Sequence, residues 1–63
     1  MTIIKRLREK KGLTQMELAS AIDVSQASVA LWEGGACFPR PEKLPRLAKV
    51  LGCTIDDLFS DEK

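Results

Sequence analysis

The 63-residue sequence contains no histidine and no tyrosine, and it has only one tryptophan and two cysteines. The absence of histidine removes the commonest general base and metal ligand, and with it any catalytic triad built on histidine. Cys37 and Cys53 are too few for a disulfide framework or a four-ligand zinc site. There is also no glycine-rich phosphate loop, so we expect neither an enzyme nor a metal or cofactor site.

Long apolar runs are missing as well. Lys5, Arg6 and Arg8 interrupt the first residues, which therefore do not resemble a signal peptide. No stretch approaches the roughly 20 apolar residues that a membrane span needs. Hydrophobic residues make up 44% of the chain and charged residues 30%, a balance typical of a soluble globular protein. The sequence predicts one small cytoplasmic domain over residues 1–63, with no membrane partner.

The apolar residues recur at helical spacing, and no alternating strand pattern is sustained. Glycines and prolines divide the chain into five helical segments. The predicted helices are residues 3–11, a helix that begins after Thr14, residues 26–33, a helix that begins near Pro45 after a looser turn, and a short helix after Thr54. The predicted fold is all-α, a compact bundle of five short helices.

The second and third predicted helices carry the most information. Thr14 and Glu17 have the spacing of a capping box, and Ser25 is the expected N-cap of the next helix after a turn of about three residues. Two capped helices joined so closely are typical of the helix-turn-helix, whose second helix can enter the major groove of DNA. The spacing predicts this motif over residues 14–33, with Val29 facing the core.

Several segments of the chain also follow one another in a characteristic order: Leu13-Thr14-Gln15, Glu17-Leu18-Ala19, Val24-Ser25, Trp32-Glu33-x-Gly35 and Leu47-Ala48-x-x-Leu51-Gly52. In this order and spacing they resemble the helix-turn-helix domains of the phage lambda-repressor and Cro family. The resemblance covers nearly the whole chain. It implies that the third helix recognises double-stranded DNA.

The resemblance implies roles for individual residues. Gln15 matches a glutamine that contacts phosphate and stabilises the recognition helix, while Arg8 and Glu33 match a structural ion pair. The positions that match base contacts are Gln26, Ala27, Ser28 and Leu31. The candidate phosphate contacts are Gln15, Ser25, Arg40 and Lys43. The amide of Gln26 has suitable chemistry, because it can donate to N7 of adenine and accept from the N6 amine.

Charge is distributed in blocks, although the net charge is only +1. Residues 1–12 contain five basic residues and one acidic residue, residues 13–39 three acidic residues and no basic one, and residues 40–53 four basic residues and one acidic residue. Basic residues therefore flank the predicted motif in sequence, which suits contacts with phosphates on both sides of a neutral recognition helix. A solvated helix face remains the alternative for each of them. We favour Arg40 as a phosphate contact.

The predicted recognition helix is nearly apolar where Ala27, Ala30 and Leu31 lie opposite its core side. Two functions therefore remain open. The first is a sequence-specific transcriptional regulator, expected to be a repressor, that binds double-stranded DNA as a homodimer on a symmetric operator. The second is a helix-turn-helix module that docks a protein through this apolar face. No small-molecule effector is indicated.

The last predicted helix carries three apolar residues, Ile55, Leu58 and Phe59. They are the candidate dimer surface of the first function. Simple core packing is an equal alternative for all three, because a short helix must bury its apolar side somewhere.

Overall fold

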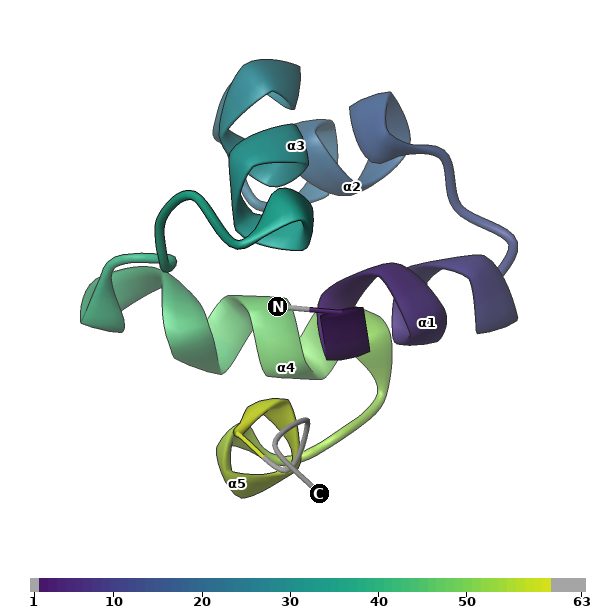
Figure 1. The fold of residues 1–63 in the computed structure, drawn as a ribbon. Coiled ribbons are helices and arrows are strands. Elements are labelled where there is room, and N and C mark those ends of the chain that lie inside the picture. The colour runs from purple at the N-terminus through teal and green to yellow at the C-terminus, as the bar shows by residue number, and fades with distance from the viewer. Residues whose placement is uncertain (1, 60–63) are drawn as a thin grey trace.

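The computed structural model describes residues 2–59, which form five α-helices and one 3-10 turn. The elements are α1 (Thr2–Lys10), α2 (Gln15–Ala21), α3 (Gln26–Gly34), η1 (Pro41–Lys43), α4 (Leu44–Leu51) and α5 (Ile55–Leu58). In Figure 1, α2 and α3 lie together at the top, α1 and α4 cross the middle, and α5 lies below α4. The prediction of an all-α bundle of five short helices is confirmed. The expected domain extends to residue 63, but residues 1 and 60–63 lie outside the described residues.

Both helices of the central motif begin at the predicted caps. The Thr14 hydroxyl accepts a hydrogen bond from the Glu17 amide at 3.0 Å, and the Glu17 carboxylate accepts one from the Thr14 amide at 2.8 Å. The Ser25 hydroxyl accepts from the Ser28 amide at 3.1 Å. These bonds satisfy backbone amides that have no partner within the first turn of a helix. They fix the residues at which α2 and α3 begin.

The turn between α2 and α3 depends on a left-handed residue. Asp23 has a φ of 60°, and within residues 2–59 no other residue except glycine has a positive φ. Its own amide donates to the Ser20 carbonyl at 3.3 Å, and the Val24 amide donates to the Ala19 carbonyl at 2.9 Å. This pair of bonds ends α2 as a Schellman motif. The chain therefore leaves α2 abruptly, and only four residues separate the end of α2 from the start of α3.

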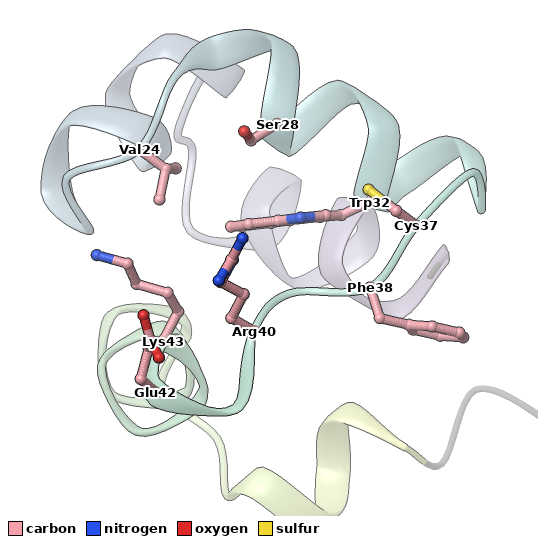
Figure 2. A pocket seen from close by; sticks show the side chains of 8 residues that line it. All are labelled: Val24, Ser28, Trp32, Cys37, Phe38, Arg40, Glu42 and Lys43. Atoms are coloured by element: carbon pink, nitrogen blue, oxygen red, sulfur yellow. The ribbon is translucent and has the colours of Figure 1, made fainter.

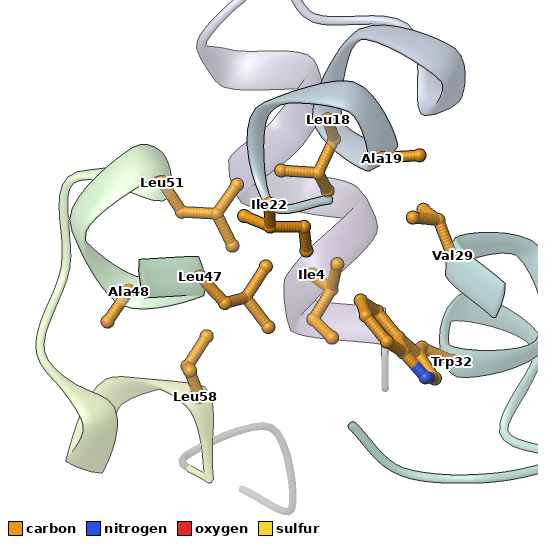
Figure 3. Close-up of a cluster of buried hydrophobic side chains, with 10 residues drawn as sticks. All are labelled: Ile4, Leu18, Ala19, Ile22, Val29, Trp32, Leu47, Ala48, Leu51 and Leu58. Carbon is orange, nitrogen blue, oxygen red and sulfur yellow. The ribbon is translucent and has the colours of Figure 1, made fainter. Parts of the chain in front are cut away.

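A single hydrophobic core joins all five helices (Figure 3). Its buried members are Ile4, Leu18, Ala19, Ile22, Val29, Trp32, Leu47, Ala48, Leu51 and Leu58. They come from the apolar sides that the helical spacing predicts, with Trp32 only 5% exposed. The tryptophan is therefore part of the core, as its spacing from Val29 indicates. No helix in residues 2–59 has the length and apolar character needed to cross a membrane.

Two helix boundaries differ slightly from the prediction. The first helix is Thr2–Lys10 instead of 3–11, and the third includes Gly34, because the left-handed cap with a φ of 83° is Gly35. The looser turn before the fourth helix is confirmed as η1. Pro45 lies in the first turn of α4, where a missing amide donor breaks no helical hydrogen bond.

The structure corrects one candidate for the dimer surface. Leu58 is fully buried in the core, so it has no surface to offer to a second copy. Its assignment as an interface residue is wrong, and the alternative of core packing holds for this residue. Ile55 and Phe59 are 39% and 53% exposed, so these two neighbours remain available at the surface.

The conformation of Asp23 generates a stability prediction. Its side chain is exposed, so a substitution changes the conformational free energy of the backbone and leaves the packing almost unchanged. Asp23→Ala should lower the free energy of unfolding by about 1 kcal/mol, because alanine tolerates the left-handed region poorly. Asp23→Gly should stay within about 0.5 kcal/mol of the parent, since its easier turn is offset by a more flexible unfolded chain. Denaturant unfolding measures both, and equal losses would show that the carboxylate matters more than the backbone.

Candidate nucleic-acid interface

One side of α3 is open to solvent. The exposed residues of this helix lie together on a helical projection and define its outer face: Gln26, Ala27, Ala30, Leu31 and Gly34. Leu31 is the largest apolar side chain on this face and is 49% exposed. Within residues 2–59, no segment covers this face. The orientation that the sequence predicts for the recognition helix is therefore the one in the structure.

The opposite side of α3 is buried. Val29 is fully buried and Trp32 nearly so, and both pack in the common core. A helix held by one side only can present its other side to a large partner without unfolding. This arrangement is the general requirement for a helix that enters a DNA groove.

A buried charge cluster holds the end of α3 against α1 and α2. The Arg8 guanidinium donates through Nε to Glu33 Oε2 at 2.7 Å and through Nη2 to Glu33 Oε1 at 3.3 Å. Its Nη1 donates to the Leu13 carbonyl at 2.7 Å, and Gln15 Nε2 donates to Glu33 Oε1 at 2.9 Å. The side chains of Arg8 and Glu33 are only 10% and 5% exposed. The family resemblance implies an ion pair between Arg8 and Glu33 and a stabilising role for Gln15. The structure contains the hydrogen bonds that both of these require.

The cluster changes the titration of both charged groups. Burial alone would raise the pKa of Glu33, but hydrogen bonds from Arg8 and Gln15, together with the Arg8 charge, outweigh it and lower this pKa. The hydrogen bond to Glu33 raises the pKa of Arg8 against the opposing effect of burial. Both groups are therefore charged at neutral pH. The Glu33 carboxylate accepts hydrogen bonds from residues of two neighbouring helices, so its role is structural.

The first turn of α3 places two hydroxyl groups together. Ser25 Oγ and Ser28 Oγ lie 3.0 Å apart, within hydrogen-bond distance, and Ser25 is exposed while Ser28 is half-buried. Gln26 follows Ser25 directly and is exposed. The exposed side-chain amide of Gln26 and the exposed hydroxyl of Ser25 thus both lie at the N-terminus of α3. A helix N-terminus also favours anionic groups such as phosphate.

A groove of about 510 Å³ separates α3 from the segment that follows it (Figure 2). It is lined by Val24, Ser28, Trp32, Cys37, Phe38, Arg40, Glu42 and Lys43. The Arg40 side chain extends toward the indole ring of Trp32, and the Lys43 side chain points toward Val24 (Figure 2). Two of the predicted phosphate contacts, Arg40 and Lys43, therefore lie beside α3, together with one carboxylate, that of Glu42.

The remaining basic residues are exposed on other elements. Lys5, Arg6, Lys10 and Lys11 lie on or directly after α1, and Arg46 and Lys49 lie on α4. Two cations, Arg40 and Lys43, line the groove beside α3, and Arg8 of α1 is committed to Glu33. The blocks of charge in the sequence thus divide into two cations beside α3 and a larger group distributed over α1 and α4.

Sequence reasoning missed three surface features. It did not anticipate the groove, because the groove forms only when the loop after α3 folds back beside Trp32. It also did not anticipate that Met16 and Phe38 are 64% and 67% exposed. The absence of helical periodicity around Phe38 is the one signal that could have indicated a side chain outside the core.

Neither cysteine forms a disulfide. Cys37 is exposed and Cys53 is half-buried against the core. Burial, and the negative charge of Asp57, raise the pKa of the Cys53 thiol, which therefore stays protonated at neutral pH. This environment fits a packing role for Cys53.

The fold and the outer face of α3 define a helix-turn-helix protein, and comparison with known families agrees. A family model described as a helix-turn-helix domain matches residues 3–59. The chain belongs to this family. The match confirms the resemblance to domains of the lambda-repressor and Cro type.

Curated relatives are regulators of transcription. DicA of Escherichia coli K12, an HTH-type transcriptional regulator, is 42% identical over 98% of this chain and 49% of its own length. BcrR of Enterococcus faecalis, an HTH-type transcriptional activator, is 38% identical over 95% of this chain and 29% of its own. RstR, a transcriptional repressor of the cryptic phage CTXphi in Vibrio cholerae, is 35% identical over 95% and 54%. The chain thus spans between 29% and 54% of these relatives.

Solved structures share the fold. A transcriptional regulator from Listeria innocua superposes with a TM-score of 0.80 at 34% identity, over 89% of this chain and 52% of that one. ClgR, the clp gene regulator of C. glutamicum, also gives a TM-score of 0.80, at 29% identity over 92% and 75%.

The Glu33 cluster generates a pH prediction. Because folding lowers the Glu33 pKa, this carboxylate contributes stability above about pH 4.5, and the contribution is lost as the pH falls below that value. Glu33→Gln should lower the free energy of unfolding at pH 7 by about 2 kcal/mol, since Arg8 loses a charged partner. The variant should also lose less stability than the parent between pH 5 and about pH 3.

The control is Glu42→Gln, which removes an exposed carboxylate from η1. Denaturant unfolding at several pH values should give this variant the same acid-induced loss as the parent. A Glu33→Gln profile parallel to that of the parent would show that the cluster does not govern the acid response.

Proposed function

We propose that this chain is a sequence-specific transcriptional regulator that binds double-stranded DNA with α3 in the major groove. The observation that carries the proposal is the open outer face of α3, opposite a side buried by Val29 and Trp32. Family membership and the regulatory names of the relatives support it. A domain of this kind regulates most simply by occupying a site that transcription needs, so we propose repression.

The proposal assigns roles around α3. Gln26, Ala27, Ser28 and Leu31 contact base edges, and Gln26 supplies the amide for adenine. Gln15, Ser25, Arg40 and Lys43 contact phosphates. The positions of Arg40 and Lys43 in the groove beside α3 support this division, because cations at the edge of a recognition helix meet the DNA backbone.

We also propose that the chain binds as a homodimer on an operator with two-fold symmetry. Each copy offers one recognition helix, and the described residues measure 27 × 23 × 22 Å. Two such copies fit half-sites about 34 Å apart, one turn of DNA. Exposed Ile55 and Phe59 on and after α5 form part of the contact between copies. Doubling the base and phosphate contacts supplies the affinity that one small domain lacks.

The proposal gives the chain no catalytic step, metal, cofactor or small-molecule effector. Binding to DNA implies a location in the compartment that holds the genome, in line with the cytoplasmic expectation from the sequence.

Selection of bound duplexes from a random pool tests the proposal. The selected sequences should share a motif with two inverted half-sites, and affinity for that motif should fall steeply as salt rises, because bound cations displace counterions from DNA. Failure to enrich any motif, with residual binding that disappears at physiological salt, would reject a sequence-specific regulator.

The second candidate function is docking of a protein on the outer face of α3. The apolar character of Ala27, Ala30 and Leu31 favours it, since exposed apolar surface often marks a protein contact. The duplex selection separates the two functions, because a protein-docking module gains no affinity from a particular DNA sequence.

For Gln26, we expect a loss of discrimination. Gln26→Ala should weaken binding to the selected operator by about 1–3 kcal/mol and relax the preference at one base pair per half-site. Binding titrations against all four base pairs at each position measure this. If discrimination stays unchanged at every position, Gln26 does not contact a base.

For Arg40, we expect a change that is independent of sequence. Arg40→Gln should weaken binding to operator and random duplexes alike and reduce the slope of affinity against salt by about one contact per copy. Arg40→Lys keeps the charge and should keep the slope. Thermal unfolding of both variants controls for the loss of the Arg40 side chain beside Trp32. An effect confined to one operator base pair would contradict a phosphate contact.

A further inference from the structure

The outer face of α3 has little hydrogen-bonding capacity beyond its first residue. Gln26 is the polar side chain on this face, and Ala27, Ala30, Leu31 and Gly34 have no polar side-chain atoms. The other polar side chains of α3 lie off the face, and the indole of one of them, Trp32, is buried in the core. Ser28 is half-buried with its hydroxyl 3.0 Å from that of Ser25, and Glu33 is held by Arg8 and Gln15. Base discrimination past the first turn therefore depends on apolar contacts.

The shape of this face singles out one residue. Ala27, Ala30 and Gly34 are short, and no atom lies within 4 Å of a Cβ built on Gly34. The backbone of α3 can therefore approach the floor of the DNA major groove closely. Leu31 is the one long side chain on the face after Gln26 and is 49% exposed. A helical side chain leans toward the N-terminus, so Leu31 extends over Ala27, four residues earlier, and the two form a continuous apolar surface.

The chemistry of the major groove restricts what this surface can recognise. A leucine side chain neither donates nor accepts a hydrogen bond. Among the groups that base pairs expose in the major groove, the C5 methyl of thymine is the apolar one. We propose that Leu31, with Ala27 beside it, discriminates base pairs through the thymine methyl group. The inference rests on the DNA-binding function proposed above and names the chemical group that determines specificity.

The surroundings of the face favour DNA over a protein as its partner. Arg40 and Lys43 lie beside α3 in the groove, where their charge is complementary to a phosphate backbone. Phosphates at the edges and methyl groups on the groove floor match this combination of peripheral cations and a central apolar surface.

The test replaces thymine with uracil, a change that removes only the C5 methyl. With the parent protein and the selected operator, each thymine is replaced in turn and affinity is measured. One position per half-site should weaken binding about fourfold, the factor expected for losing the burial of one methyl-sized group, while most other positions should change little. When the same base pair is changed to cytosine–guanine, 5-methylcytosine should bind better than cytosine by a similar factor, because its methyl group occupies the same place.

Two variants assign the effect to its residue. Leu31→Ala removes the contact from both copies of the dimer, so it should bind the thymine operator about sixteenfold more weakly and bind thymine and uracil operators equally. Phe38→Ala removes an exposed apolar side chain from the loop after α3 and should keep the full difference. Both side chains are exposed, so thermal unfolding should show that each variant remains folded.

The outcomes separate this inference from the proposed function. A selected operator in which no thymine responds to uracil, or a uracil effect that persists in Leu31→Ala, overturns the methyl contact and leaves DNA binding intact. A parent protein that selects no duplex overturns both and favours a protein partner for the face.

Discussion

The hydrogen-bonded ion pair between Arg8 and Glu33 is the interaction on which the position of α3 depends. Taking two charges out of water is costly, and an ion pair alone often fails to offset that cost. Here the Leu13 carbonyl and the Gln15 amide complete the set of partners, so no buried polar side-chain atom within residues 2–59 lacks a hydrogen bond. The cluster contributes direction more than net stability, because hydrogen bonds fix an orientation that apolar packing alone leaves adjustable.

Because α3 is attached to the domain through its opposite side, the outer face of α3 has no structural role. Val29, Trp32 and Glu33 hold the helix from one side, and no residue of the outer face packs in the core. A domain of this size buries only about 60% of the surface of its unfolded chain, so some large apolar side chains remain outside. Met16, Leu31, Phe38, Ile55 and Phe59 are those residues. Leu31 differs from the others because it lies on the outer face of α3, which is otherwise small and uncharged.

Local signals in the sequence predict most of this fold. The capping pair Thr14–Glu17 forms as its spacing indicates, the short last helix begins after Thr54 as predicted, and Pro45 lies where a helix tolerates it. Each of these features depends on residues a few positions apart. The groove beside α3 and the burial of Leu58 depend on contacts between distant segments, which periodicity alone cannot describe. The same distinction applies to the site: sequence and family resemblance placed Arg8 near Glu33, but the joint hydrogen bond of Gln15 required the packed helices.

A neutral recognition helix divides affinity and specificity between different parts of a DNA-binding protein. Cations on the helix itself would attract any duplex, because phosphate contacts are independent of sequence. Within α3 the one charged residue is Glu33, which is neutralised by Arg8, so the helix adds almost no sequence-independent attraction. In the function proposed here, the general attraction comes from peripheral groups such as Arg40 and Lys43 and from a second copy. The proposed regulator would then bind DNA weakly as a single copy and discriminate through the fit of small apolar groups, so the proposed dimer matters more here than it would for a basic recognition helix.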